Sequence, residues 1–192
     1  MKFGFVSPVD KALFDRTHGA WSQQLAENPA NTSSTYYGAG LDYCRRVVSG
    51  EKVFADGGGC LCAVVEEGRD TATALLIVSH AKAQSDEPFL KMLDVYVQPN
   101  LNLANAEPNY PELAWIAATA IVGCLGLTYK DFPSRQLKVH TAFPLDRDFM
   151  VSLMAVFFTQ KDWAENYEVN MHGSWLVLDK KVGTNGSHVR AV

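Results

Sequence analysis

The chain has 192 residues, of which 47% are hydrophobic and 20% charged, and its formal net charge is -4. This is the composition of a globular domain rather than of a disordered chain, and the length suits one core better than two. The acidic balance predicts neither a nucleic-acid partner nor an anionic membrane surface. The longest apolar run, Ala114 to Leu127, is shorter than the ~20 residues of a membrane crossing, and the first residues lack a signal-peptide pattern. We therefore expect a soluble, cytoplasmic protein.

The first quarter of the chain predicts a strand and two helices. Lys2 to Val6 has the content of a short strand, and Ser7 is the expected N-cap of a helix that ends near Glu27. After a turn-rich stretch, apolar residues at helical spacing from Tyr37 to Val48 predict a second helix that ends at Gly50.

Three extended segments follow, separated by turn signals. They are Cys60 to Glu66, Thr71 to His80 and Phe89 to Gln98, and all are rich in β-branched and apolar residues. Short connections favour an antiparallel meander. Cys60 and Cys62 share one face of the first segment, but no metal-ligand spacing follows them, so we expect reduced thiols and no metal.

The second half predicts a helix at Pro111 to Thr128 that is apolar on almost every side, which is typical of a helix buried between layers. A strand at Gln136 to Thr141 and a helix from Asp146 to Phe158 come next. A closing strand pair, 163–170 and 174–179, is joined by a turn at Met171 to Gly173. Residues 1–179 form one predicted domain, and the polar residues 180–192 form a predicted flexible tail.

The element order is β-α-α-β-β-β-α-β-α-β-β, an α/β arrangement with a mixed sheet. That order resembles the GNAT superfamily of acyl-CoA-dependent N-acyltransferases over about residues 2–179. Three local segments agree with it: Leu90 to Pro99 resembles the fourth strand, Leu137 to His140 the fifth, and His172 to Leu178 the last hairpin. The resemblance implies a GNAT-like sheet that splays open between its fourth and fifth strands.

The resemblance also implies an acetyl-CoA cofactor and an amine acceptor. In the family, the pantetheine arm pairs with the exposed backbone of the fourth strand, which here implies the peptide groups of Val95, Tyr96 and Val97. The pyrophosphate lies at the N-terminus of the following helix, where free N–H groups favour an anion.

The sequence departs from the family at that phosphate loop. From Pro99 to Pro111 there is no Gly, Lys or Arg, while Glu107 and Glu112 place two acids near the expected phosphates. Glycine normally lets the backbone approach a phosphate, and like charge repels it. Phe158 stands where family members often have a proton-donating Tyr. These departures predict poor binding of the CoA pyrophosphate.

Two residues are candidates for a general base. Asp94 on the fourth strand can accept a proton from an amine through water, or it can be a structural carboxylate that pairs with Lys91 or Lys138. His140 on the fifth strand titrates near neutral pH, but a histidine there is also typical of a hydrogen-bonded sheet residue.

Two functions remain open on this evidence. One is a divergent N-acyltransferase that uses an acyl-CoA. The other is a non-catalytic structural or adaptor subunit, as GNAT-like members are in tailed-phage particles, with a protein partner or a second copy docked through the tail. In that case the protein resides in a virus particle.

Overall fold

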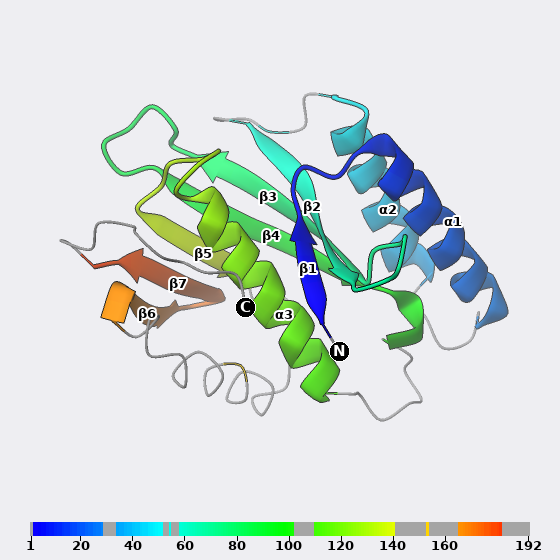
Figure 1. The fold of residues 1–192 in the computed structure, drawn as a ribbon. Coiled ribbons are helices and arrows are strands. Elements are labelled where there is room, and N and C mark those ends of the chain that lie inside the picture. Colours follow the sequence, from blue (N-terminus) through cyan, green and yellow to red (C-terminus); the bar gives the residue numbers. More distant parts are fainter. Residues whose placement is uncertain are drawn as a thin grey trace.

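A computed structural model describes residues 2–28, 34–51, 54, 58–101, 110–140, 153 and 165–181. Within these residues the strands form one sheet in the order β1-β2-β3-β4-β5-β7-β6 (Figure 1). Only the β4–β5 pair is parallel. The predicted meander and mixed sheet are confirmed. The strands are β1 Phe3–Val6, β2 Gly59–Glu66, β3 Ala74–Ala81, β4 Phe89–Val97, β5 Gln136–His140, β6 Tyr167–His172 and β7 Trp175–Lys180.

Helices cover the two faces of the sheet. Figure 1 shows α1 and α2 packed side by side on one face and α3 crossing the other. Each face has its own buried cluster, one built with α1 and α2 and the other with α3. The helices are α1 Lys11–Glu27, α2 Ser34–Val48 and α3 Tyr110–Leu127, with a short 3-10 turn, η1, at Pro99–Leu101.

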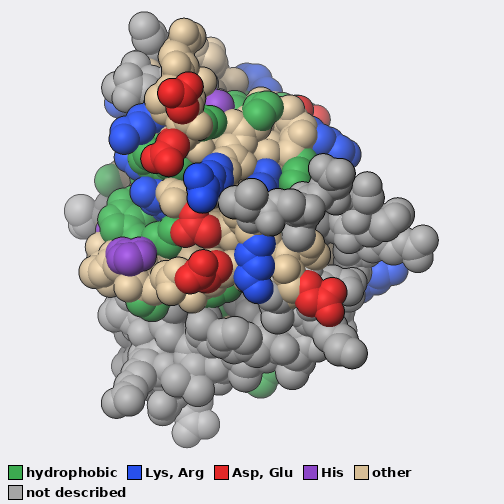
Figure 2. Space-filling model, turned by 90° about the vertical axis from the view of Figure 1, so that its left-hand side faces the viewer, with side chains coloured by type: hydrophobic (Ala, Val, Ile, Leu, Met, Phe, Trp, Pro, Cys, Tyr) green, Lys and Arg blue, Asp and Glu red, His purple; other side chains and the backbone are tan. Residues whose placement is uncertain are grey.

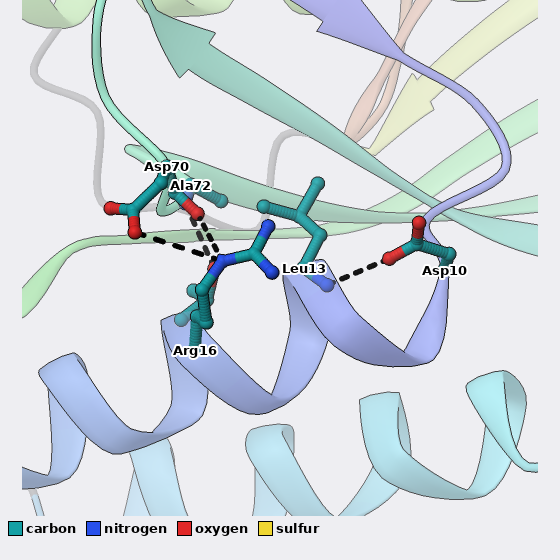
Figure 3. Close-up of polar contacts among 6 residues, drawn as sticks. Asp10, Leu13, Arg16, Asp70 and Ala72 are labelled. Carbon is teal, nitrogen blue, oxygen red and sulfur yellow. Dashed lines mark hydrogen bonds and ion pairs between the residues drawn. The ribbon is translucent and has the colours of Figure 1, made fainter.

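The start of α1 differs from the prediction. Asp10, not Ser7, is the N-cap, and its carboxylate accepts a hydrogen bond of 2.7 Å from the Leu13 N–H (Figure 3). The chain bends at Ser7 and Pro8, and the Val9 N–H then donates to the Leu61 carbonyl at 2.8 Å. Pairing with the sheet therefore delays the helix by one turn relative to its local signals.

Polar contacts attach α1 to the turn between β2 and β3. Arg16 Nε donates to the Asp70 carbonyl at 2.9 Å (Figure 3). The buried Thr17 hydroxyl accepts from the Ala72 N–H at 2.9 Å, and Trp21 Nε1 donates to the Ala72 carbonyl at 3.1 Å. These bonds satisfy backbone groups at the edge of the meander and fix the helix along the sheet.

Helix α3 lies on one face of the sheet rather than between two layers. Ile121 is 1% exposed in the core, as expected of a central buried helix, whereas Trp115 is 52% exposed, so part of this apolar helix reaches the surface. Gly123 permits the close approach of β1, since a Cβ there would lie 2.1 Å from the Phe5 ring. The described residues place no second layer over the outer side of α3.

The C-terminal pair extends further than predicted. Met171 and His172 belong to β6, and the turn lies at Gly173 and Ser174, with φ +60° at the glycine. Strand β7 continues to Lys180, whose ammonium donates to the Thr128 carbonyl at 2.9 Å. Burial lowers the pKa of Lys180 to about 8.

Two further predictions fall mostly outside the described residues. Of the helix expected at 146–158, only Leu153 is described, and it is 3% exposed in the core cluster on the α3 side. The tail from residue 182 onward also lies outside them.

Candidate functional site

Strands β4 and β5 separate part-way along their length. Their parallel register runs from Phe89 opposite Gln136 to Met92 opposite Val139. Among the described residues, β4 pairs beyond Met92 with β3 alone, while β5 continues to His140 beside β7. The described sheet therefore opens between β4 and β5 at the point that the resemblance implied.

A β-bulge lies at the start of this opening. On β3, Ile77 is opposite Asp94 and Val78 is opposite Met92, so Leu93 is an extra residue on β4. A bulge bends its strand and shifts the alternation of side chains by one. Met92 belongs to the core on the α3 side, but Asp94 shares the face of Ile77, which is covered by α1 and α2. Regular alternation would have placed Asp94 on the opposite face.

The backbone of β4 directs polar groups into the opening. The Gln98 N–H donates to the Thr73 carbonyl at 2.8 Å, toward β3. Because successive peptide groups of a strand point to opposite edges, Tyr96 also faces β3, and Val95 and Val97 face the β5 side. The Val97 carbonyl accepts from the Tyr37 hydroxyl at 2.8 Å. Among the described residues, no partner is bonded to the Val97 N–H or to the polar groups of Val95, which point toward the opening.

Asp94 lies among phenols and a thiol. Burial is the main cause that raises the pKa of Tyr36 and the pKa of Cys44 to about 12. The negative charge of Asp94 is the second cause in both cases. The same two causes, in the same order, raise the pKa of Tyr43 and Tyr96. The rings of Tyr36 and Tyr96 lie 5.4 Å apart. Asp94 therefore faces groups that stay neutral and can donate hydrogen bonds.

Asp94 makes no ion pair with any residue that the structure describes, so the alternative in which it pairs with Lys91 or Lys138 has no support in the described contacts. The ammonium groups of both lysines lie near the ring of Phe89, the first residue of β4. A half-buried carboxylate without a cation is the kind of group that a positively charged ligand can satisfy.

His140 lies across the opening from Asp94. Leu137 and Val139 of β5 face the core on the α3 side, so His140 points to the opposite face, as Asp94 does. Its ring is 4.7 Å from that of Trp175. The structure thus brings the two predicted residues to one face, one on each of the separating strands.

Helix α3 begins beside the C-terminal end of β4. Pro111 has no N–H to offer in its first turn, and Glu112 places a carboxylate there. Residues 102–109, which include Glu107, lie outside the described part. Among the described residues, no group of three His, Cys, Asp or Glu is arranged to hold a metal, and none of the helices is long and apolar enough to cross a bilayer.

The order of the elements and the opening between β4 and β5 match the architecture that the resemblance implied. The described residues thus form a mixed α/β sheet with helices on both faces, the arrangement that the resemblance to the GNAT superfamily implied. No family model and no curated protein sequence matches the chain.

Three solved structures are similar in fold. The NatC complex bound to Gag peptide and CoA aligns with 94% of this chain and 100% of its own, at 8% identity and TM-score 0.47. A protein from Desulfovibrio desulfuricans assigned to the GNAT family aligns over 93% and 97%, at 11% identity and TM-score 0.42. An acetyltransferase from Agrobacterium tumefaciens aligns over 89% and 86%, at 11% identity and TM-score 0.39. All three TM-scores are below 0.5, so this similarity in fold says nothing about activity.

Sequence reasoning missed the bulge and the tyrosines around Asp94. A signal for the bulge was present, because apolar residues of β4 change from even to odd positions between Met92 and Leu93. No local signal predicted Tyr36 and Tyr43, because they reach Asp94 from a helix more than 40 residues earlier in the chain.

Proposed function

We propose that the protein transfers an acyl group from a pantetheine thioester to an amine. The observation that supports this best is the opening between β4 and β5, with the peptide groups of Val95 and Val97 directed into it. A pantetheine arm contains two amides and can hydrogen-bond to such an edge as an added strand does. The thioester is then delivered to the face where Asp94 and His140 lie.

The proposed chemistry uses Asp94 as the base, through a water molecule. The amine loses a proton toward Asp94, its nitrogen attacks the thioester carbonyl, and the C–S bond breaks as the N–C bond forms. The thiolate leaves and takes a proton from solvent. His140, on the other strand, is the second candidate for the base. The neighbouring phenols of Tyr36 and Tyr96 stay protonated and serve to position the amine.

We propose that the nucleotide half of CoA contributes little to binding. Glu112 in the first turn of α3 and the missing N–H of Pro111 weaken the anion site of a helix N-terminus. The sequence from Pro99 to Pro111 adds neither a glycine nor a cation. The pantetheine arm would then supply most of the affinity for the donor.

Calorimetry with two donors tests this proposal. Acetyl-CoA and S-acetylpantetheine should bind with similar affinity, within about threefold, because the phosphates find no site. Val97→Pro removes the N–H that points into the opening and should weaken both donors without breaking a bond to β3. Its melting temperature serves as the folding control. Absence of heat with either donor at millimolar concentration would overturn the function, and a strong preference for acetyl-CoA would overturn the account of the phosphate loop.

A non-catalytic subunit that keeps the scaffold is the second candidate. Glu112 at the helix start and Phe158 in the expected proton-donor position favour it. Under this proposal the protein binds a protein partner and turns over no donor. Acyl transfer that depends on Asp94 would exclude it.

A further inference from the structure

Three lysine side chains converge on the ring of Phe89. The ammonium nitrogens of Lys138, Lys91 and Lys82 lie 4.0, 5.3 and 5.9 Å from the ring centroid. Each distance is within the range of a cation–π contact. One aromatic ring therefore gathers three positive charges from β4, from β5 and from the turn after β3.

The backbone holds these charges together despite their repulsion. Lys91 and Lys138 are directly opposite each other in the parallel register of β4 and β5. Like charges at such positions destabilise a sheet. Lys82 has a φ of +52°, a conformation that non-glycine residues adopt rarely. The opposed lysines and the positive φ of Lys82 both cost free energy of folding, and both lie at the Phe89 ring. We therefore expect a further contact there that offsets this cost.

No described carboxylate supplies that contact. None of the three lysines makes an ion pair with a described residue, and the nearby Glu87 pairs at 3.8 Å with Arg135 instead. Figure 2 shows one face of the molecule, on which Lys and Arg side chains lie interspersed with Asp and Glu. The three lysines around Phe89 therefore form a cluster of positive charge without an ion-pair partner among the described residues.

A groove lies beside the lysines. Its volume is about 360 Å³, and it runs over the strands that α1 and α2 leave uncovered. Among the described residues that line it, Asp179 is the one acidic residue, against Lys91 and Lys138. It also offers aromatic and apolar surface. The lining residues are Phe89, Lys91, Gln136, Lys138, His172, Trp175, Val177 and Asp179.

We propose that this groove binds the phosphate group of a small ligand, with Lys91 and Lys138 on the phosphate and Lys82 adding positive charge from beside the Phe89 ring. Ammonium groups act as point charges that suit a compact dianion, whereas a planar carboxylate is matched better by arginine. The apolar part of the ligand lies against Trp175. Phe89 is six residues from Val95, about 20 Å along the strand, so the phosphate would lie away from the proposed pantetheine-binding edge. The Trp175 end of the groove adjoins His140, whose ring lies 4.7 Å from that of Trp175.

Titration with phenyl phosphate at low ionic strength, followed by NMR or calorimetry, tests the proposal. Binding should saturate at one site and weaken as salt is added. Lys138→Gln and Lys91→Gln should each weaken binding about tenfold, as expected for the loss of a charge-assisted contact. Lys2→Gln, which removes the same charge from the exposed segment before β1, should leave binding unchanged. Benzoate, a carboxylate of similar shape, should bind more weakly than phenyl phosphate.

Thermal unfolding gives a second readout that does not require tight binding. Without ligand, the double variant Lys91→Gln/Lys138→Gln should melt no lower than the wild type, because a repulsion has been removed. Phenyl phosphate should raise the melting temperature of the wild type and not that of the double variant. No saturable binding, equal weakening by Lys2→Gln, or a stabilising effect retained by the double variant would overturn the site. Equal affinity for benzoate would overturn its assignment to phosphate.

Discussion

At the scale of single residues, the charge of Asp94 acts on its neighbours as the second cause, after burial, of their raised pKa values. It raises the pKa of three tyrosines and of a buried cysteine without an ion-pair partner among the described residues. A carboxylate in this position can attract a cationic amine and can take a proton from it. Both roles predict that the charge, rather than the size, of Asp94 matters.

Asp94→Asn keeps the size of the side chain and removes its charge. We expect acyl transfer to fall about 10²- to 10⁴-fold, the usual contribution of a general base, while donor binding persists. The pKa of Tyr36 should fall from about 12, because one cause of its rise is removed while burial remains. Steady-state kinetics and an ultraviolet titration of the phenols measure the two effects. Asp42→Asn, on the exposed side of α2, is the control. A shifted phenol titration with an unchanged rate would show that Asp94 is not the base.

Cys44 makes the stability sensitive to alkaline pH. Burial, and then Asp94, raise its pKa from 9.0 to about 12, so the unfolded thiol ionises before the folded one does. This contribution to stability is complete below about pH 9 and is lost as the pH rises from about 9 to about 12. The melting temperature should therefore drop across this window, and less so in Cys44→Ala. An equal drop in both proteins would assign the alkaline instability to the tyrosines.

At the scale of elements, the contact between α2 and β4 depends on a glycine. A Cβ on Gly40 would lie 2.3 Å from the Tyr96 ring, whereas a Cβ on Gly38 meets nothing within 4 Å. The helix can approach the strand only because Gly40 leaves room for that ring. The same approach brings Tyr36 to the ring of Tyr96, beside Asp94.

Gly40→Ala should destabilise the protein by about 1–3 kcal/mol, because the added methyl group forces the aromatic ring or the helix to move. Gly38→Ala should stabilise it by up to about 1 kcal/mol, since alanine is the better helix former and no contact is disturbed. Denaturant unfolding of the pair measures the difference. Equal stabilities would show that Tyr96 rotates away without cost.

At the scale of the whole molecule, the sheet separates two hydrophobic cores. Leu76 and Val78 face α3, while Leu75 and Ile77, their neighbours on the same strand, face α1 and α2. A sheet buried on both faces explains why β3 is apolar at nearly every position. Stability then depends on α3 as much as on the N-terminal helices.

Ile121→Asp should unfold the domain at ordinary temperature. The change places an unpaired charge in the core on the α3 side, at a cost of several kcal/mol. Trp115→Asp on the same helix is the matched control, because Trp115 is 52% exposed, and its effect should stay within about 0.5 kcal/mol. Circular dichroism melts measure both. A strong loss in Trp115→Asp would mean that another segment covers this side of α3.

The sequence by itself determined the order of the elements, the meander and the strand that carries the candidate site. The element order and the meander follow from the spacing of apolar residues and from turn chemistry, which are local, whereas the strand of the candidate site was implied by the resemblance to the GNAT superfamily. The tertiary structure decided what depends on distant neighbours. The extra residue at Leu93 turns Asp94 toward α2, and pairing with Leu61 moves the start of α1 to Asp10. Packing on a single side leaves Trp115 exposed, and the register of two parallel strands sets Lys91 against Lys138. In each case, contacts between segments far apart in the sequence override or supplement a local preference. Such contacts exist only in the folded chain, so no local sequence pattern predicts them.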